Sequence, residues 1–268
     1  MNSKKKHAVS VIARVIYVIA LLVIWECVAR SGILGPRSSL IFPSLEQIGE
    51  AFIKNFIKGY AGTSLWIYIA NSMKLLLTGL VIGILLAFIL SGMSMVSFIF
   101  FKIYDLTVSV FDLLPGIALL PVVIIIFGVR EEVIVFLVVH AVLWPMSRNM
   151  LDGFNATPRI YVEAGKNMGL KGAGLIFGVY LPAAASYIVS GLKSGWARAW
   201  RGLISAEMIF GIASSPGIGL FINQMRTNMN NAEMYATLLV IIIIGVIVQY
   251  GILRPIEVNT VRKWGMTK

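Results

Sequence analysis

The sequence predicts an all-α, polytopic membrane protein with six transmembrane helices. Of its 268 residues, 58% are hydrophobic and only 13% are charged, whereas a soluble domain usually carries about 25% charged residues. The mean hydropathy is +0.87, and the apolar residues come in blocks of the length, about 20 residues, that a helix needs to cross a bilayer. We therefore expect one transmembrane domain over residues 1–268, surrounded by lipid.

Six apolar blocks define the expected spans. They cover residues 11–28, 66–90, 106–128, 133–150, 183–210 and 235–253. The first block follows Lys4, Lys5 and Lys6, a pattern that it shares with a secretory signal peptide. Its length and the poor cleavage pattern at Cys27-Val28-Ala29 favour a helix that is retained in the membrane.

The distribution of Lys and Arg orients the expected helices, because cytoplasmic loops carry an excess of these residues. With the N-terminus in the cytoplasm, the inside segments hold Lys4, Lys5, Lys6, Arg14, Lys102, Arg148, Arg159, Lys166, Lys171, Arg254, Arg262, Lys263 and Lys268. The outside segments hold only Arg30, Arg37, Lys54, Lys58, Arg130 and Arg226. We therefore expect both termini and residues 151–181 in the cytoplasm.

Residues 31–64 form the longest expected extracytoplasmic segment. Within this segment Ser44 is a suitable N-cap for a helix. The apolar positions that follow it are Leu45, Ile48, Phe52 and Phe56. We expect a capped amphipathic helix that lies at the membrane surface or against the rim of the helix bundle.

Neither nucleic-acid binding nor metal chemistry is predicted. The net charge is +11, but the basic residues lie between apolar blocks rather than on a hydrophilic face. Cys27 is the only cysteine, so no intrachain disulfide framework forms. His7 and His140 are too few and too far apart for a metal site, and we expect His140 to pack with its ring nitrogens satisfied.

Charged side chains inside the spans usually face a cavity, a partner or the interior of a helix bundle. Lys193, Arg198 and Arg201 fall within an arc of about 140° on the fifth expected span. This arc would give a positive stripe suited to an anionic substrate. Alternatively, these residues neutralise Asp112 or Glu207, or reach lipid phosphates.

Two prolines in the third expected span add to the candidate pathway. Pro115 and Pro121 each remove a helix hydrogen bond and favour a kink. Kinked spans suit a gate, although membrane helices also carry proline simply as a packing residue. The candidate pathway residues are therefore Lys193, Arg198, Arg201, Glu207, Pro115 and Pro121.

The cytoplasmic segment 158–182 carries the most specific pattern in the chain. Pro158 can start a short helix, and Gly169 can end it by adopting a positive φ. A second short helix then leads to Pro182, where the next span begins. Two short helices that meet at a glycine predict a compact protrusion on the cytoplasmic face.

The residues of this segment resemble the signature of the permeases of binding-protein-dependent ABC importers. That signature reads Glu-Ala-Ala, three residues, Gly, nine residues, an aliphatic residue, one residue, an aliphatic residue and Pro. Gly165 replaces the second alanine, which loosens the helix by up to about 1 kcal/mol. The resemblance implies a type I importer fold whose loop sits in a groove of an ATPase subunit. The implied coupling residues are Glu163, Ala164, Gly165, Gly169, Leu181 and Pro182.

Other stretches resemble one branch of these permeases, which serves nitrate, taurine, alkanesulfonate and bicarbonate importers. The matching stretches are Gly191-Leu192-Lys193, Ala199-Trp200, Ala206-Glu207, Gly217-Ile218-Gly219 and Arg262-Lys263-Trp264. This branch implies a small solute, such as a sulfonate, taurine or nitrate, delivered by an extracytoplasmic substrate-binding protein. Lys193 stands where an arginine is more usual.

The resemblance also implies partners for this chain. No Gly-x-x-x-x-Gly-Lys-Ser/Thr phosphate loop is present, so the chain does not hydrolyse ATP through that fold. We expect a separate ATPase subunit in two copies, which binds ATP and Mg, and no cofactor on this chain. One coupling loop in a six-span chain is half of a pathway, and a homodimer is its simplest completion. The expected location is the bacterial inner membrane.

A secondary transporter or channel that works without an ATPase is the main alternative. It would require coupling-ion or selectivity residues, usually at broken helices in two related halves, and no duplicated half is visible. A membrane-embedded enzyme is a second alternative, but the sequence lacks the His, Asp, Glu and Cys constellation that such an enzyme requires.

Overall fold

A computed structural model describes residues 3–33, 35, 41–60, 62–212 and 214–262. The chain divides into two compact units, each with its own internal contacts. Unit 1 comprises residues 1–66 and 221–240, and unit 2 comprises residues 67–220 and 241–268. The regular elements within the described ranges are helices, apart from an isolated bridge between Tyr60 and Thr63. Arg37, Lys263, Trp264 and Lys268, which contributed to the predictions from sequence, lie outside the described residues.

Helices that are long and apolar enough to cross a membrane agree with most of the expected spans. Four such helices cover Ile12–Arg30, Leu65–Ser94, Glu131–Asn155 and Asn231–Thr260. Two bent pairs pass the same test, namely Phe98–Leu113 with Gly116–Phe127 and Ala173–Ala183 with Ala185–Ile209. The described part of the chain thus has six spans if each bent pair counts as one.

The third expected span, residues 106–128, is broken at Pro115, one of the two prolines at which a kink was predicted. The structure has helix α5 at Phe98–Leu113, the short 3-10 helix η1 at Gly116–Leu119 and helix α6 at Leu120–Phe127, with a bend of 91° between α5 and the η1–α6 segment. Pro115 lies at the break, in an extended conformation with φ −63° and ψ 120°. Pro121 instead occupies the first turn of α6, where a missing N–H has no helical partner to lose.

Unit 1 is organised around the short helix α3, Leu45–Ile57. Ser44 caps α3 in a capping box with Gln47, so the predicted N-cap is confirmed. Ile48 and Ala51 are buried against Ala236 of helix α13, Asn231–Val246. Trp25 of helix α1, Ser3–Arg30, stacks on Phe42 with ring centroids 3.9 Å apart. The amphipathic helix expected after Ser44 therefore exists, and its apolar face packs on α13.

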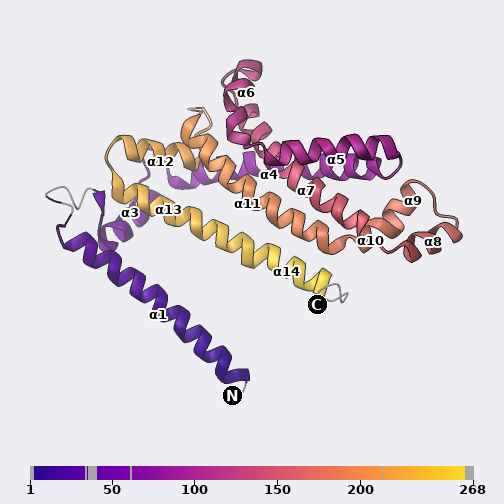
Figure 1. Ribbon diagram of the computed structural model, residues 1–268. Helices are drawn as coiled ribbons and strands as arrows, with labels where there is room; N and C mark the ends of the chain where they lie inside the picture. Colours follow the sequence, from indigo (N-terminus) through magenta and orange to yellow (C-terminus); the bar gives the residue numbers. More distant parts are fainter. Residues whose placement is uncertain (1–2, 34, 36–40, 61, 213, 263–268) are drawn as a thin grey trace. The chain divides into compact units, whose positions relative to one another are not determined.

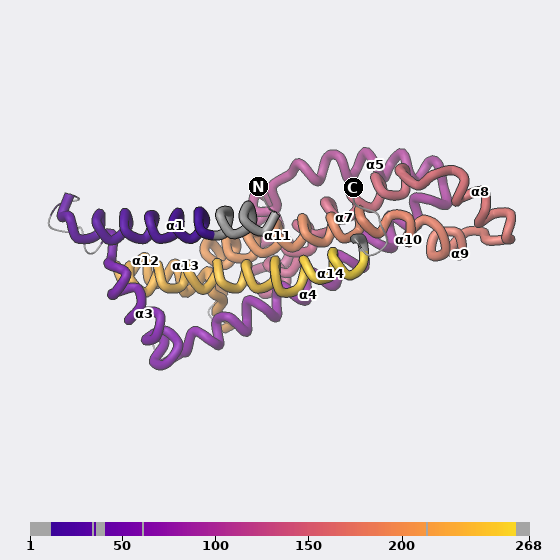
Figure 2. Tube along the Cα trace, turned by 90° about the horizontal axis from the view of Figure 1, so that it is seen from below, coloured from indigo at the N-terminus to yellow at the C-terminus, as the bar shows by residue number. Residues whose placement is uncertain are grey.

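Unit 2 is built on two long helices that pack along each other, α7 at Glu131–Asn155 and α11 at Ala185–Ile209. Figures 1 and 2 show them side by side. Gly191 lies at their interface, where a Cβ would come within 2.9 Å of the Met146 sulfur and 3.0 Å of the Asn149 Cβ. Lipid tails are as apolar as leucine, so such close backbone approach, rather than burial from water, stabilises helix pairs in membranes.

Two further helices extend this framework within unit 2. Helix α4, Leu65–Ser94, brings Gly83 against Val142 of α7, and its buried Ala87 shares a core with Phe154. Helix α5 packs on α7 through Tyr104, whose hydroxyl lies 2.6 Å from the Ser147 hydroxyl. These contacts hold α7 between its neighbours, so residues on its faces are positioned by rigid elements.

The chain between α7 and α11 forms a hairpin at one end of unit 2. It contains helix α8 at Arg159–Asn167, the single turn α9 at Ala173–Leu175, the π-helix η2 at Ile176–Tyr180 and the turn α10 at Leu181–Ala183. In both views α8 and α9 lie beyond the ends of α7 and α11 (Figures 1 and 2). A bend of 76° separates the α9–α10 segment from α11.

Candidate functional site

The hairpin of residues 158–182 is the first candidate site, and its glycine stop is built as predicted. Helix α8 follows Pro158, and Gly169 has φ +83° directly after the helix. The Leu170 N–H donates to the Gly165 carbonyl over 3.0 Å, and the Gly169 N–H donates to the Lys166 carbonyl over 2.9 Å. This pair of bonds is a Schellman motif, which satisfies carbonyls that the helix end would leave unpaired. The predicted role of Gly169 as a positive-φ helix stop is confirmed.

Gly165 joins the two arms of the hairpin. A Cβ at Gly165 would come within 2.7 Å of the Val179 Cγ2 and 3.0 Å of the Leu175 Cδ1. Both Gly165 and Val179 are buried. The small residue at this position therefore lets α8 pack on the second arm, and it faces the inside of the hairpin rather than its surface.

The outer surface of the hairpin carries the remaining signature residues together with several large apolar side chains. Glu163 and Ala164 are exposed on α8, and Pro182 is exposed on the second arm. The exposed apolar side chains on the hairpin are Ile160, Tyr161, Met168 and Phe177. Leu181 points inward and packs on the core cluster that contains Phe154. The hairpin thus exposes both charged and large apolar side chains, and exposed apolar groups rimmed by polar ones are typical of a protein-docking surface.

The second candidate site is a cavity of about 290 Å³ at the break between α5 and η1. Its lining comes from the break, from α7 and from α11. The polar or charged residues in the lining are Asp112, His140, Trp144, Arg198, Arg201 and Ser205. The structure therefore brings Arg198, Arg201 and Pro115 of the candidate pathway together in one cavity.

The charges of the cavity do not balance. The Arg198 Nη1 lies 2.5 Å from the Asp112 Oδ1, so these two residues form an ion pair. Arg201 is exposed and has no ion pair or hydrogen bond to any other residue that the structure describes. With Arg198 compensated by Asp112, one positive charge remains at the cavity wall.

The remaining candidate pathway residues lie outside this cavity, and the expected positive stripe through Lys193 stays a prediction. The Lys193 Nζ forms an ion pair of 2.8 Å with the Glu257 Oε2 and does not line the cavity. Glu207 is only 1% exposed and also lies outside the cavity lining. Spacing along one helix placed these residues on a shared arc, but the neighbouring elements decide which of them meet.

Glu207 has a structural partner that no pattern in the sequence indicated. Its carboxylate accepts hydrogen bonds from the Ser72 hydroxyl over 2.8 Å and from the Gly219 N–H over 2.9 Å. The Ser72 hydroxyl in turn accepts a bond of 2.8 Å from the Ile218 N–H. Ile218 and Gly219 begin helix α12, Ile218–Thr227. Glu207 and Ser72 therefore hold the start of α12, where unpaired N–H groups favour an acceptor.

His140 departs from its expected role as a satisfied packing residue. It is 7% exposed, and neither its Nε2 atom nor the Trp144 Nε1 atom has a hydrogen-bond partner among the described residues. The two rings lie edge to face with centroids 6.0 Å apart. No group of three or more His, Cys, Asp or Glu residues that could hold a metal ion occurs in the described ranges.

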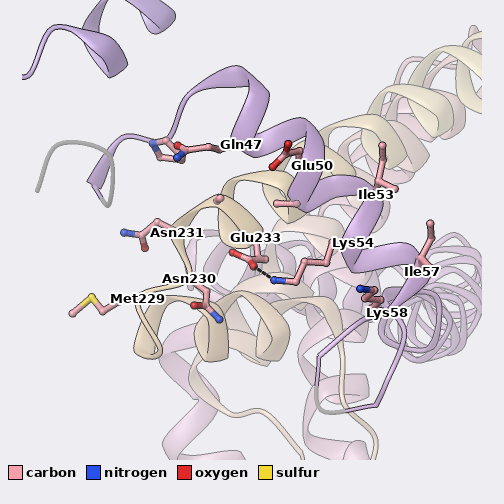
Figure 3. Close-up of a pocket in the computed structure, with 13 residues that line it drawn as sticks. Gln47, Glu50, Ile53, Lys54, Ile57, Lys58, Met229, Asn230, Asn231 and Glu233 are labelled. Atoms are coloured by element: carbon pink, nitrogen blue, oxygen red, sulfur yellow. Dashed lines mark hydrogen bonds and ion pairs between the residues drawn. The ribbon is translucent and has the colours of Figure 1, made fainter.

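Unit 1 carries a separate groove of about 660 Å³ between α3 and the turn that precedes α13. Figure 3 shows Lys54 of α3 reaching across to Glu233 of α13, and the Nζ and Oε1 atoms are 2.6 Å apart. Asn55 lies buried beside this pair and donates to the Glu233 carbonyl over 3.2 Å. These bonds tie α3 to α13. The sequence indicated only the charge of Lys54 and not this contact, because its partner Glu233 is distant in the chain.

Comparison with known proteins supplies an independent view of these sites. Residues 79–254 match the family model of the binding-protein-dependent transport system inner membrane component. A taurine transport system permease protein of Escherichia coli (strain K12) is 26% identical over 87% of this chain and 82% of its own length. A nitrate import permease protein of Synechocystis is 26% identical over 90% and 86%. Another E. coli K12 permease, named for the transport of aliphatic sulfonates, is 29% identical over 85% and 82%.

Proposed function

Because this chain belongs to the family of binding-protein-dependent transport system inner membrane components, we propose that it conducts a small oxyanion across the bacterial inner membrane and that an ATPase subunit drives this transport by acting on the hairpin. The chain is a permease subunit of an ATP-driven ABC importer, and such importers work with an ATPase subunit and a substrate-binding protein. The observation that carries the proposal is that Glu163 and Ala164 are exposed on a hairpin whose two arms pack closely at Gly165.

The hairpin is suited to transmit force to the ATPase. Its arms are held by the contact of Gly165 with Val179 and by the Schellman motif at Gly169. A rigid protrusion moves as one body, so closure of the ATPase would be passed to α7 and α11, between which the hairpin lies. Glu163 supplies a polar anchor, Ala164 permits close approach, and Tyr161 and Met168 supply apolar contact.

A charge reversal at Glu163 tests the coupling proposal. In Glu163→Lys we expect co-purification of the ATPase and ATP-driven uptake to fall by about tenfold or more, because a charged anchor is replaced by its opposite. Membrane insertion should stay normal, since Glu163 is exposed and no described residue bonds to it. Glu50→Lys, the same change at an exposed site on α3, should leave ATPase co-purification unchanged. Normal co-purification and uptake in Glu163→Lys would overturn the docking role.

The substrate class is supported by two independent observations. The relatives are named for taurine, nitrate and aliphatic sulfonates, which all present negatively charged oxygens. The α5–α7–α11 cavity of this chain has an uncompensated arginine at its wall. A guanidinium recognises such oxygens through paired N–H donors. We infer that Arg198, Arg201 and the Pro115 break line the pathway, while Lys193, Glu207 and Pro121 stabilise its surroundings.

The assembly that we propose contains two copies of this chain and two ATPase subunits. Each copy contributes one hairpin, and a twofold axis is the commonest way to pair identical chains. The excess of Lys and Arg in the inside segments supports cytoplasmic termini and a cytoplasmic hairpin. The substrate-binding protein would then dock on the opposite side, and ATP and Mg would be bound by the ATPase alone. Nothing in the comparisons supports a secondary transporter or channel instead.

A further inference from the structure

We propose that the cavity at the break between α5 and η1 is an oxyanion-binding site in which Arg201 is the recognition group. The inference rests on the proposed function, because it assigns the substrate's charged group to one place in this permease. Its ligand is a single sulfonate or nitrate-like group, and the organic remainder of a larger substrate would extend beyond the cavity. Arg201 and Ser205 of α11 form the polar wall.

The charge balance of the cavity favours one monoanion. Asp112 compensates Arg198 through the 2.5 Å ion pair, and the Arg198 Nη1 also lies 3.4 Å from the Asp112 carbonyl oxygen. Arg201 has no compensating acid among the described residues. An isolated charge within membrane depth is costly, and a bound anion or an acidic partner lowers that cost. The cavity therefore lacks one negative charge.

The positions on α11 match the geometry of an oxyanion. Arg201 and Ser205 are four residues apart, so they lie on the same face of the helix. Gly202 also lines the cavity and leaves room beside them. The planar guanidinium offers two parallel N–H donors to two oxygens, and the Ser205 hydroxyl can donate to a third. Sulfonate and nitrate both have three terminal oxygens for such a set of donors.

Helix α7 contributes buried polar side-chain atoms to the same cavity lining. His140 is more than nine-tenths buried and lines the cavity, and its Nε2 atom has no partner among the described residues. The Trp144 Nε1 atom is also buried and has no hydrogen-bond partner among the described residues. Buried polar atoms without partners are rare, and each needs an explanation such as a ligand or water. Two of them beside one cavity indicate a wall built for a polar occupant.

The break in the helix explains why the site lies here. The chain turns by 91° between α5 and the η1–α6 segment, and Pro115 and Gly116 of the turn line the cavity. A Cβ at Gly116 would lie 3.2 Å from the His140 Nδ1, so the turn packs directly on the histidine. Discontinuous helices are used by other transporters to form substrate sites at membrane depth. Movement of this turn would change access to His140.

The test measures anion binding to the permease–ATPase complex in nanodiscs, without the binding protein. The thermal unfolding midpoint is recorded against sodium methanesulfonate and, separately, sodium nitrate, with sodium chloride holding the ionic strength constant, since a ligand that binds only the folded state raises the midpoint. We expect a saturable rise for the wild type with at least one of the two probes. In Arg201→Gln the half-saturating concentration should rise about tenfold or more, as for loss of a charged hydrogen-bond partner.

Three further variants make the result specific to the cavity. Arg201→Lys keeps the charge without the planar fork and should show an intermediate weakening. Asp112→Asn frees Arg198 and should lower the half-saturating concentration several-fold. Lys193→Gln, outside the cavity and paired with Glu257, should bind like the wild type. Arg201→Lys also keeps the test usable if Arg201→Gln does not yield a monodisperse complex.

Two results would overturn the proposal. One is that methanesulfonate and nitrate both raise the wild-type unfolding midpoint no more than chloride does. The other is an unchanged half-saturating concentration in both Arg201 variants. The proposed function fails separately, if the ATPase does not co-purify with the wild-type chain. An intact complex without anion binding would therefore reject this site alone.

Discussion

At the residue scale, the same motif ends helices α8 and α12, with a different residue at its left-handed position in each. Gly169 has φ +83° after α8, and Met229 has φ +57° after α12. The Asn230 N–H donates to the Met225 carbonyl over 2.9 Å, and the Met229 N–H to the Arg226 carbonyl over 3.2 Å, as in the hairpin. Glycine adopts this conformation without strain, whereas an L side chain is disfavoured there.

Replacing Met229 by glycine should therefore stabilise the end of α12. The Met229 side chain is 70% exposed, so little packing is lost. We expect the free energy of unfolding to rise by up to about 1 kcal/mol. This is the backbone strain that glycine relieves, minus the cost of ordering the more flexible glycine on folding. Native-state hydrogen exchange of the Asn230 amide would measure it. Met229→Ala is the matched control, because it removes the side chain and keeps the strain, and an equal gain there would contradict the explanation.

Of these two positive-φ positions, the sequence predicted only Gly169. A glycine between two amphipathic segments is a signal for a positive φ, so the stop at Gly169 could be predicted. A methionine carries no such signal, and the turn at Met229 became visible only from the backbone. Buried pairs such as Glu207 with Ser72 were hidden in the same way, because they join residues that are far apart in the chain.

At the element scale, the hairpin departs from its family signature at Gly165, and the structure gives a reason. Alanine at this position would place its Cβ 2.7 Å from the Val179 Cγ2. Overpacking of this kind costs about 1–3 kcal/mol, while alanine in place of glycine within a helix contributes up to about 1 kcal/mol. The steric term is the larger one, so glycine is the better residue opposite Val179.

The sign of the Gly165→Ala effect should therefore depend on Val179. In the wild-type background we expect Gly165→Ala to destabilise the hairpin by about 1 kcal/mol, the difference between these two terms. In a Val179→Ala background the closer contact is removed and the remaining one, 3.0 Å to the flexible end of Leu175, can relax, so the same change should stabilise α8. Hydrogen exchange of the Met168 and Leu170 amides, which bond to carbonyls of α8, reports both values. A change of equal sign in the two backgrounds would show that Val179 does not determine the effect.

The existence of the helices was predictable, whereas their breaks were only partly so. Continuous apolar runs indicate spans because the bilayer requires them. The run through residues 106–128 stays apolar on both sides of Pro115, so composition alone could not show that the chain turns by 91°. The proline indicated a kink but not its size. Periodicity placed Lys193 on the arc of Arg198 and Arg201, yet Glu257 from a later segment takes Lys193 away from the cavity.

At the scale of the whole molecule, the proposed mechanism requires the hairpin to be on the cytoplasmic side. The two sites of this permease then have opposite access: the ATPase meets the hairpin from inside, and the solute arrives from outside. This orientation is predicted from thirteen inside and six outside Lys and Arg residues, and it can be measured. Direct labelling is therefore the appropriate measurement.

Single cysteines can determine the orientation, because the native chain has only one, the exposed Cys27. In a Cys27→Ser background, Ala164→Cys marks the hairpin and Met229→Cys marks the turn after α12, and both positions are exposed. In sealed cells whose outer membrane is permeable, a membrane-impermeant maleimide should label the Met229→Cys variant. The Ala164→Cys variant should stay unmodified until the inner membrane is opened. The positive-inside rule gives this expectation, since the α7–α11 connection carries Arg159, Lys166 and Lys171. Labelling of the Ala164→Cys variant in sealed cells would place the hairpin outside, where no ATPase could reach it.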